Sequence, residues 1–439
     1  MIKRVKIQGY KSLREVEVRL ASLSVLFGPN AAGKSNFLDA LQLLSRIATS
    51  RNLKEAFEPP YRGKPLESYW FGDGGIEGLL EKDSAAFSVE VDVELSPGVI
   101  HDVNRQISEM KSGKASSGNG GAPTQKEPAF IRWKNLRYRI EVEIRPKTGL
   151  LRVADEYLAP LGGRGQPIER PSPYLEMDQK DYRFHLRMEG QSHPTFFDRY
   201  VDHSIISRPH YPPHFPHLTA LKKEMESWLF FYLEPRERMR ASTPVKEVHH
   251  IGSMGEELAA FLNTLNTLSP PQFQAVERAL RSIIPSITGI RPEVNKMGEV
   301  ELSLLEGNTP VPARVVSEGT LRILGLLALA GVKDPPAVVG FEEPENGIHP
   351  RRIRDIAELL TNRTILGETQ LIVTTHSPIL PDLVPDTSLY VCRKEKGATR
   401  IEPLKYWGSL ARKSAVDTAL DDKECLPVSE RMLRGDFDA

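Results

Sequence analysis

The sequence predicts an α/β fold that combines a mainly parallel sheet with an antiparallel, β-rich lobe and an α+β insertion. A short apolar run, Ser24–Phe27, leads through a glycine-containing loop into a helix-like pattern from Asn36 to Arg46. Two later runs, Ala337–Glu345 and Gln370–Pro378, are continuously apolar before they turn polar, which is typical of strands buried on both faces of a parallel sheet. Segments 87–95 and 136–144 alternate apolar with polar residues and predict antiparallel strands with one solvated face.

Composition limits the class of protein. A chain of 439 residues forms one large or two to three ordinary domains, and its 58 basic residues balance 58 acidic ones, so no global field attracts nucleic acid or membrane. Two cysteines, Cys392 and Cys425, are too few for a disulfide framework or a cysteine metal site and fit a reducing cytosol. The charged start, Met1–Lys6, is not a signal sequence, and the longest apolar run is about half of a membrane span. We therefore expect a cytoplasmic protein with no membrane partner.

The first motif is a phosphate loop. Residues Gly28-Pro-Asn-Ala-Ala-Gly-Lys-Ser35 fit the Walker A spacing G-x-x-x-x-G-K-[ST] between a strand and a helix. Glycine lets successive N–H groups point at phosphate oxygens, and the helix N-terminus adds positive charge. Lys34 would reach the β- and γ-phosphates, and the Ser35 hydroxyl would hold magnesium. The alternative is a glycine-rich turn with a solvated lysine. The predicted phosphate-binding residues are Gly28, Pro29, Asn30, Ala31, Ala32, Gly33, Lys34, Ser35 and Asn36.

Residues 1–27 predict two or three strands, and the turn Gly9–Ser12 carries a lysine that either faces the nucleotide or is solvated. Further along, residues 111–126 are rich in Gly, Ser and Lys and predict a flexible loop. Basic residues flank this loop and surround Trp133: Arg105, Lys111, Lys114, Lys126, Arg132, Lys134, Arg137 and Arg139. They either contact a phosphate backbone or solvate a strand face. Prolines interrupt the histidines of segment 210–217, so no metal is predicted there.

Helical apolar spacing at 258–265 and 273–284 predicts two packing helices, and no heptad repeat is long enough for a coiled coil. A turn of small polar residues, Ser317–Thr320, then opens the apolar helix 321–330. Its free N–H groups and hydroxyl could bind an anion, although an ordinary N-cap looks the same.

Two adjacent carboxylates, Glu342 and Glu343, end the apolar run that begins at Ala337. The C-terminal edge of a parallel sheet places such side chains beside the phosphate loop, where one can orient magnesium and the other a water. His376 ends the next buried run at the same predicted edge, which favours a γ-phosphate contact over a purely structural role.

The order of these four motifs resembles the ABC-type ATPases of the SMC/RecF/OLD group, and most closely their short AAA/OLD-like members without a Toprim domain. The resemblance covers residues 1–46 and about 251–392. It implies a discontinuous ABC-ATPase head made of an antiparallel lobe and a RecA-like lobe, an insertion at 47–250 and a short extension at 393–439.

The resemblance also implies roles. Two heads dimerise face to face and enclose ATP between one phosphate loop and the other subunit's signature, here Ser317, Glu318, Gly319 and Thr320. Ser35 and Glu342 would hold magnesium, and the catalytic residues would be Glu343, His376 and Lys34. Glu343 would polarise the attacking water, and His376 would sense the γ-phosphate. Two departures stand out: the wider group usually has Asp-Glu where this chain has Glu342-Glu343, and segment 228–235 lacks the usual Q-loop glutamine.

The favoured function is an ATP-switched dimeric head, open to larger assemblies, that controls DNA or a nuclease or toxin from a neighbouring gene in bacterial anti-phage defence. About sixty residues follow His376, and they predict a hairpin (389–392 and 400–404) and a short helix at 406–420. An OLD-type nuclease is less favoured, because Asp421, Asp422 and Glu424 have too little chain around them for a Toprim domain. A RecF-like DNA-binding repair protein is the other alternative. The missing coiled coil and the Ser-Glu-Gly-Thr signature disfavour an SMC tether and a transporter subunit.

Overall fold

The computed structural model describes residues 1–112, 130–178, 180, 182–189, 193–198, 200–329, 335–365, 367, 369–407 and 426–437. Residues 113–126 of the predicted flexible loop, most of the predicted helix 406–420, and Asp421, Asp422, Glu424 and Cys425 lie outside this range. The chain folds into two compact units. The first comprises Met1–Leu20, Asn36–Trp228 and Lys394–Ile401, and the second comprises Ala21–Ser35, Leu229–Arg393 and Glu402–Ala439.

An eight-stranded antiparallel sheet forms the first unit, in the order β2-β1-β4-β5-β6-β7-β8-β9. Its strands are β1 (Ile2–Tyr10), β2 (Leu13–Arg19), β4 (Ala85–Glu94), β5 (Asn135–Arg145), β6 (Leu150–Pro160), β7 (Leu175–Met177), β8 (Phe184–Arg187) and β9 (Pro194–Phe197). Strands β4 and β5 are the two that alternation predicted, and they pair with Val89 opposite Ile140. Their apolar residues are buried, so the predicted one-sided sheet is confirmed.

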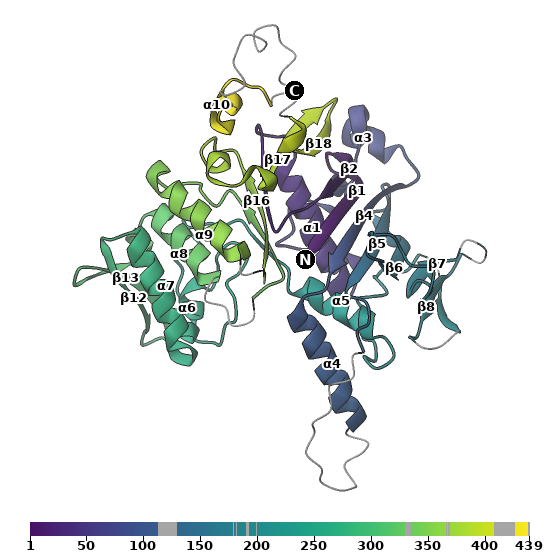
Figure 1. Ribbon diagram of the computed structural model, residues 1–439, viewed down its shortest axis with the longest axis horizontal. Helices are drawn as coiled ribbons and strands as arrows, with labels where there is room; N and C mark the ends of the chain where they lie inside the picture. Colours follow the sequence, from purple (N-terminus) through teal and green to yellow (C-terminus); the bar gives the residue numbers. More distant parts are fainter. Residues whose placement is uncertain are drawn as a thin grey trace. The chain divides into compact units, whose positions relative to one another are not determined.

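Helices accompany this sheet: α1 (Lys34–Thr49), α2 (Leu53–Ala56), α3 (Gly75–Leu80), α4 (Pro97–Ser112) and α5 (Pro216–Glu226). Helices α4 and α5 pack on each other (Figure 1). The amino group of Met1 lies 3.1 Å from the carboxylate of Glu224, which is fully buried in α5 and also accepts a hydrogen bond from the backbone of Ser96. This buried carboxylate thus joins the start of β1 to the two helices.

Three of the basic residues that flank the predicted loop, Lys134, Arg137 and Arg139, are paired within the sheet. Arg137 donates two hydrogen bonds, of 2.6 and 2.8 Å, to Asp92, and Lys134 lies 2.7 Å from Glu94. Arg139 bonds Asp155 at 2.5 Å. Because these contacts neutralise much of the local charge, they support a solvated strand face more than a phosphate-binding one.

The second unit contains a six-stranded sheet in the order β10-β15-β16-β3-β17-β18. Its strands are β3 (Leu23–Phe27), β10 (Leu229–Phe231), β15 (Val338–Glu342), β16 (Gln370–Thr375), β17 (Leu389–Glu395) and β18 (Ala398–Pro403). The pairs β10–β15, β15–β16, β16–β3 and β3–β17 are all parallel, which confirms the predicted mainly parallel sheet. In register, Glu342 lies opposite Thr374, and Thr374 lies opposite Leu26. The three central strands therefore end at one edge, where the polar motifs begin.

A second, four-stranded sheet completes this unit with β11 (Thr243–Pro244), β12 (Ile287–Val294), β13 (Glu299–Glu306) and β14 (Thr309–Pro312). Helices α6 (Leu258–Leu268) and α7 (Pro270–Ile283) lie along it (Figure 1), followed by α8 (Glu318–Ala328), α9 (Ile353–Ile365) and α10 (Val428–Leu433). The buried faces of α6 and α7 are the two predicted packing stripes. None of the described helices is long and apolar enough to cross a membrane.

These packing units do not coincide with the predicted division into 1–46 plus 251–392, 47–250 and 393–439. Tight packing and domain boundaries are separate properties, since an insertion can pack on the strands that precede it. The predicted domain boundaries therefore stay a prediction.

Candidate nucleotide-binding site

The phosphate loop joins β3 to α1 in a conformation that its glycines permit. Gly28 has φ +145° and Gly33 has φ +98°, values that L side chains rarely adopt. A Cβ on Gly28 would overlap the carbonyl oxygen of Cys392 in β17, so the loop lies directly against that strand. Helix α1 then begins at Lys34, which leaves the first N–H groups of the helix at the loop.

Lys34 is buried within this loop, with 6% of its surface exposed. Its Nζ donates hydrogen bonds to the carbonyl oxygens of Gly28 (2.8 Å) and Pro29 (2.9 Å). Burial lowers the pKa of the Lys34 ammonium, while nearby Glu343, Glu345 and Glu342 oppose this shift. A buried ammonium group whose partners are neutral carbonyl groups is suited to bind an anion that approaches the loop.

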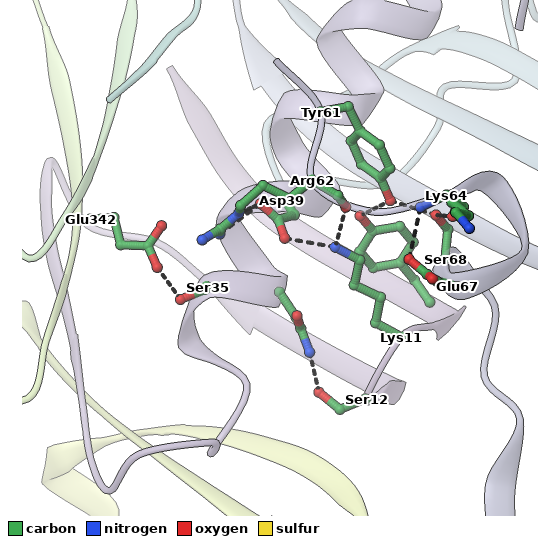
Figure 2. A network of polar contacts seen from close by, with 12 residues as sticks. Lys11, Ser12, Ser35, Asp39, Tyr61, Arg62, Lys64, Glu67, Ser68 and Glu342 are labelled. Atoms are coloured by element: carbon green, nitrogen blue, oxygen red, sulfur yellow. Dashed lines mark hydrogen bonds and ion pairs between the residues drawn. The ribbon is translucent and has the colours of Figure 1, made fainter. Parts of the chain in front are cut away.

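Glu342, the last residue of β15, accepts a hydrogen bond from the Ser35 hydroxyl at the start of α1 (Figure 2). Sequence placed these residues 307 positions apart in one metal site, and the parallel strands bring their oxygens together. A hydroxyl and a carboxylate oxygen are ligands that magnesium accepts.

Glu343 adopts an unusual backbone conformation at the end of β15. Its φ is +48°, and its N–H donates to the carbonyl oxygen of Thr374 on β16 (2.9 Å). This turn directs the side chain toward His376, whose Nδ1 lies 2.8 Å from the Glu343 Oε1. Both side chains are partly exposed, 29% for Glu343 and 46% for His376. The structure therefore pairs the predicted water-polarising carboxylate with the predicted γ-phosphate histidine.

The signature turn caps α8. Ser317 Oγ accepts a hydrogen bond from the backbone N–H of Thr320 (3.2 Å) and lies 2.8 Å from the Thr320 hydroxyl. Gly319 lies so close to the chain that a Cβ there would come within 2.6 Å of the Gly347 carbonyl oxygen. Arg236 binds Glu318 at 2.7 Å. The signature turn thus packs on the turn that follows the acidic strand, and its Ser317 remains exposed.

Two family models match the chain in sequence. A model described as "AAA ATPase domain" matches residues 1–100, which contain the phosphate loop. A model described as "AAA domain, putative AbiEii toxin, Type IV TA system" matches residues 196–382, which contain the signature, the acidic strand and His376. Both models describe ATPase domains of the AAA type, so the two segments of the chain that carry the motifs each match an ATPase domain.

Solved structures similar to this ATPase include three SMC heads. An SMC head bound to the C-terminal winged-helix domain of ScpA has a TM-score of 0.49 and 12% identity, over 91% of this chain and 97% of that one. The SMC head domain from Thermotoga maritima gives 0.40 and 15%, over 92% and 98%. An Smc head with an extended coiled coil, bound to the C-terminal domain of ScpA derived from Pyrococcus furiosus, gives 0.45 and 11%, over 94% and 98%. No curated protein matches the chain.

Sequence reasoning gave no role to a third carboxylate of this ATPase, Glu345. It is buried and accepts a hydrogen bond from the Thr375 hydroxyl, while its Oε2 has no hydrogen-bond partner among the described residues. Burial raises the pKa of Glu345 above its usual range. The same Thr375 hydroxyl accepts a hydrogen bond from the N–H of Ser377 (2.9 Å), so Glu345 and Thr375 hold the turn that carries His376.

Two further residues of the ATPase were also missed. Arg322 donates to the carbonyl oxygens of Asn346 (2.7 Å) and Leu233 (2.9 Å) and so connects α8 with the turn after the acidic strand. Cys392 lies beneath the phosphate loop, and burial raises the pKa of its thiol to about 12. A third acid in one turn and an arginine two residues after the signature are signals that the sequence alone could have given.

Lys11, predicted either to face the nucleotide or to be solvated, is held by contacts within its own unit. Its Nζ lies 2.7 Å from Asp39 on α1 and packs over the rings of Tyr10 and Tyr61 (Figure 2). Asp39 also accepts from Arg62 at 2.8 and 3.1 Å. The β1–β2 turn is therefore fastened to the helix that follows the phosphate loop.

Proposed function

We propose that this chain binds and hydrolyses ATP as a dimeric head, and that ATP-dependent dimerisation controls a separate nuclease or toxin, or DNA, in bacterial anti-phage defence. The observation that carries the proposal is the pairing of Ser35 with Glu342 beside the pair Glu343–His376. Both pairs lie at the edge of a parallel sheet from which the phosphate loop opens, where open α/β sheets bind ligands.

Magnesium would be held by the Ser35 hydroxyl and the Glu342 carboxylate. Their oxygens already lie within hydrogen-bond distance of each other, and hard divalent cations take oxygen ligands of this type. No group of three or more His, Cys, Asp or Glu side chains in the described ranges is arranged to hold a metal. That suits magnesium, which usually keeps water and phosphate ligands beside one or two protein groups. The ion would supply positive charge that offsets the charge of the phosphates.

The loop residues Gly28–Asn36 would bind the triphosphate. Their N–H groups and the start of α1 supply partial positive charge, and Lys34 would exchange its two carbonyl partners for phosphate oxygens. The exchange favours ATP because a charged acceptor forms a stronger hydrogen bond with the ammonium than a neutral carbonyl does.

Glu343 would polarise the attacking water, and His376 would orient this carboxylate and contact the γ-phosphate. Of the three acids in the turn, Glu342 is bonded to Ser35 and Glu345 is buried against Thr375. Glu343 is partly exposed and its carboxylate is paired with the partly exposed His376, so a water can reach it. Positioning and electrostatic stabilisation of this kind account for most catalysis of phosphoryl transfer.

A second copy would complete the site with its own signature, Ser317–Thr320. The exposed Ser317 and the N-terminus of α8 form a positively polarised tip that fits an anion. Neither half of the site would hydrolyse ATP efficiently alone, so ATP would act as the contact between two heads.

The proposed setting rests on one of the two family models. One matched model is described by a putative AbiEii toxin and a type IV toxin–antitoxin system, which supports a link to a toxic effector and to defence. On this proposal residues 1–46 and 251–392 form the head, 47–250 form an insertion and 393–439 an extension, all in the cytoplasm. Segment 47–250 would be available for the effector.

The test is to express the chain with its neighbouring gene, purify it through a tag and measure mass and phosphate release with and without Mg-ATP. We expect an ATP-dependent dimer, turnover and a co-purifying effector. A monomer at all ATP concentrations would contradict the proposal. DNA binding that needs ATP and weakens steeply with salt would favour the RecF-like alternative. Metal-dependent DNA cleavage by the chain alone would favour an OLD-type nuclease.

A further inference from the structure

A hollow of about 230 Å³ lies beside the phosphate loop in the second unit, and it has two chemically different sides. One side consists of residues 28–30 of the loop and His376. The other is apolar and comes from the far end of the chain, with Met432, Leu433 and Phe437. The candidate nucleotide site is therefore bordered by residues 426–437, a segment to which no function has been assigned so far.

This segment is firmly seated. Phe437 is buried, with 1% exposure, and its ring packs edge-to-face on Phe27, the residue that immediately precedes the phosphate loop (5.1 Å between centroids). The same ring contacts Trp407 at 5.5 Å, and the Arg431 guanidinium lies 4.8 Å from its centroid. Such buried aromatic contacts each contribute beyond their area alone.

A second anchor lies on the histidine side. The N–H of Ser429 donates to Asp382 (3.1 Å), which belongs to the short 3₁₀ helix Leu380–Leu383 that follows His376. Residues 426–437 thus hold both the entry to the phosphate loop and the exit from the His376 turn. A segment fixed at both ends of the site presents its remaining side chains in a defined position.

Leu433 is the side chain that this anchoring leaves outside. It is 79% exposed although it is apolar and borders the hollow. A second exposed apolar residue flanks the other half of the proposed composite site: Val315, 67% exposed, stands two residues before Ser317. Each half of the site therefore has a polar centre with an exposed apolar neighbour.

We propose that residues 426–437 form part of the surface that receives the signature turn of a second copy, and that Leu433 packs against Val315 of that copy. The polar tip at Ser317 would meet the loop and His376, and the apolar neighbour would meet the apolar side of the hollow. The match between these two surfaces of the same chain is what selects a second copy as the occupant. This inference rests on the proposed ATP-dependent dimer.

The test uses a charge pair in the Glu343→Gln background, with the mass of the protein measured by sedimentation over a concentration series with Mg-ATP. We expect Leu433→Glu and Val315→Lys each to weaken the dimer at least about tenfold, because each places a charge opposite an apolar side chain. The double variant Leu433→Glu/Val315→Lys should regain most of that loss, since the opposite charges then meet across the interface. Met297→Glu is the matched control, because Met297 is also exposed (83%) but lies in the β12–β13 turn, and it should leave the dimer unchanged.

ATP affinity of the monomer, measured with a fluorescent analogue at low protein concentration, should be unchanged in Val315→Lys and Met297→Glu, since neither residue lines the hollow beside the phosphate loop. If the background protein forms no dimer with ATP, the proposed function fails and the inference fails with it. If the background dimerises and Leu433→Glu dimerises equally well, the inference alone is wrong. A double variant no stronger than the single ones would likewise refute the pairing of Leu433 with Val315.

Discussion

Replacing Glu343 by Gln isolates the chemical step from the binding steps of this ATPase. Glutamine has the volume of glutamate and can still accept a hydrogen bond, so the 2.8 Å contact with His376 and the backbone turn at φ +48° have no steric reason to change. What the variant loses is the negative charge that polarises a water. Binding of ATP should therefore persist while hydrolysis falls.

The expected size of this effect follows from the environment of the three acids. Because Glu342 is bonded to Ser35 and Glu345 is buried against Thr375, neither can replace Glu343 as a base without leaving its partner. A positioned general base contributes about 10²–10⁴ in rate, which is about 3–5.5 kcal/mol of barrier. Turnover of Glu343→Gln should fall by that factor, and ATP-bound dimers should accumulate.

The assay is phosphate release at saturating Mg-ATP, together with mass determination in the same buffer. Glu345→Gln is the matched control, since it removes the charge of a buried carboxylate only two residues from Glu343. The turnover of this variant should stay within a few-fold of that of the parent. Unchanged turnover in Glu343→Gln, or an equal loss in both variants, would remove Glu343 from the role of base.

The remaining predictions concern binding and stability. Lys34→Ala should weaken ATP binding itself, which titration calorimetry would show, whereas ATP affinity equal to that of the parent would contradict its role. Gly28→Ala forces a Cβ onto the Cys392 carbonyl at φ +145° and should cost at least about 1–3 kcal/mol of unfolding free energy in chemical denaturation. The control Gly78→Ala, in a helix with open space around it, should stabilise by up to about 1 kcal/mol. Burial raises the pKa of Glu345 in the folded chain. The stability that the protonated carboxyl group contributes is fully present below its ordinary pKa and is lost as pH rises through its pKa in the folded chain. Glu345→Gln should therefore melt higher than the parent at pH 8 but not at pH 4, and equal differences at both pH values would refute this.

Periodicity predicted the two kinds of sheet because burial on one face and burial on two faces leave different patterns. Val89 and Ile140 were expected on one wet-faced sheet, and they are cross-strand partners. The continuous runs before Glu342 and His376 were expected in a parallel sheet, and they are neighbours in it. Local pattern could not predict β10, a three-residue strand whose place beside β15 depends on its tertiary partner.

The candidate site, like the fold, could be predicted from the sequence only in part. Spacing within one segment identified the phosphate loop and the acidic turn, because the relevant residues are close in sequence. Contacts between distant segments that carry no motif could not be predicted in this way: Phe437 on Phe27 joins residues 410 positions apart. Neither residue carries a motif, since an aromatic ring in a core is recognised only by what it touches.

Three glutamates within four residues illustrate how environment, and not residue type, assigns function here. Glu342 ends a strand whose neighbour brings a serine hydroxyl, and it becomes a candidate metal ligand. Glu343 turns back at φ +48° toward His376, stays partly exposed and becomes the candidate base. Glu345 follows a proline, points into the interior and binds the threonine that supports His376. Burial, with the nearby charge of Glu343, raises the pKa of Glu345, which weakens the charge repulsion within this acidic turn. Exchanging any one for Asp would shorten the reach of that side chain alone, so the three Glu→Asp variants should fail in different assays.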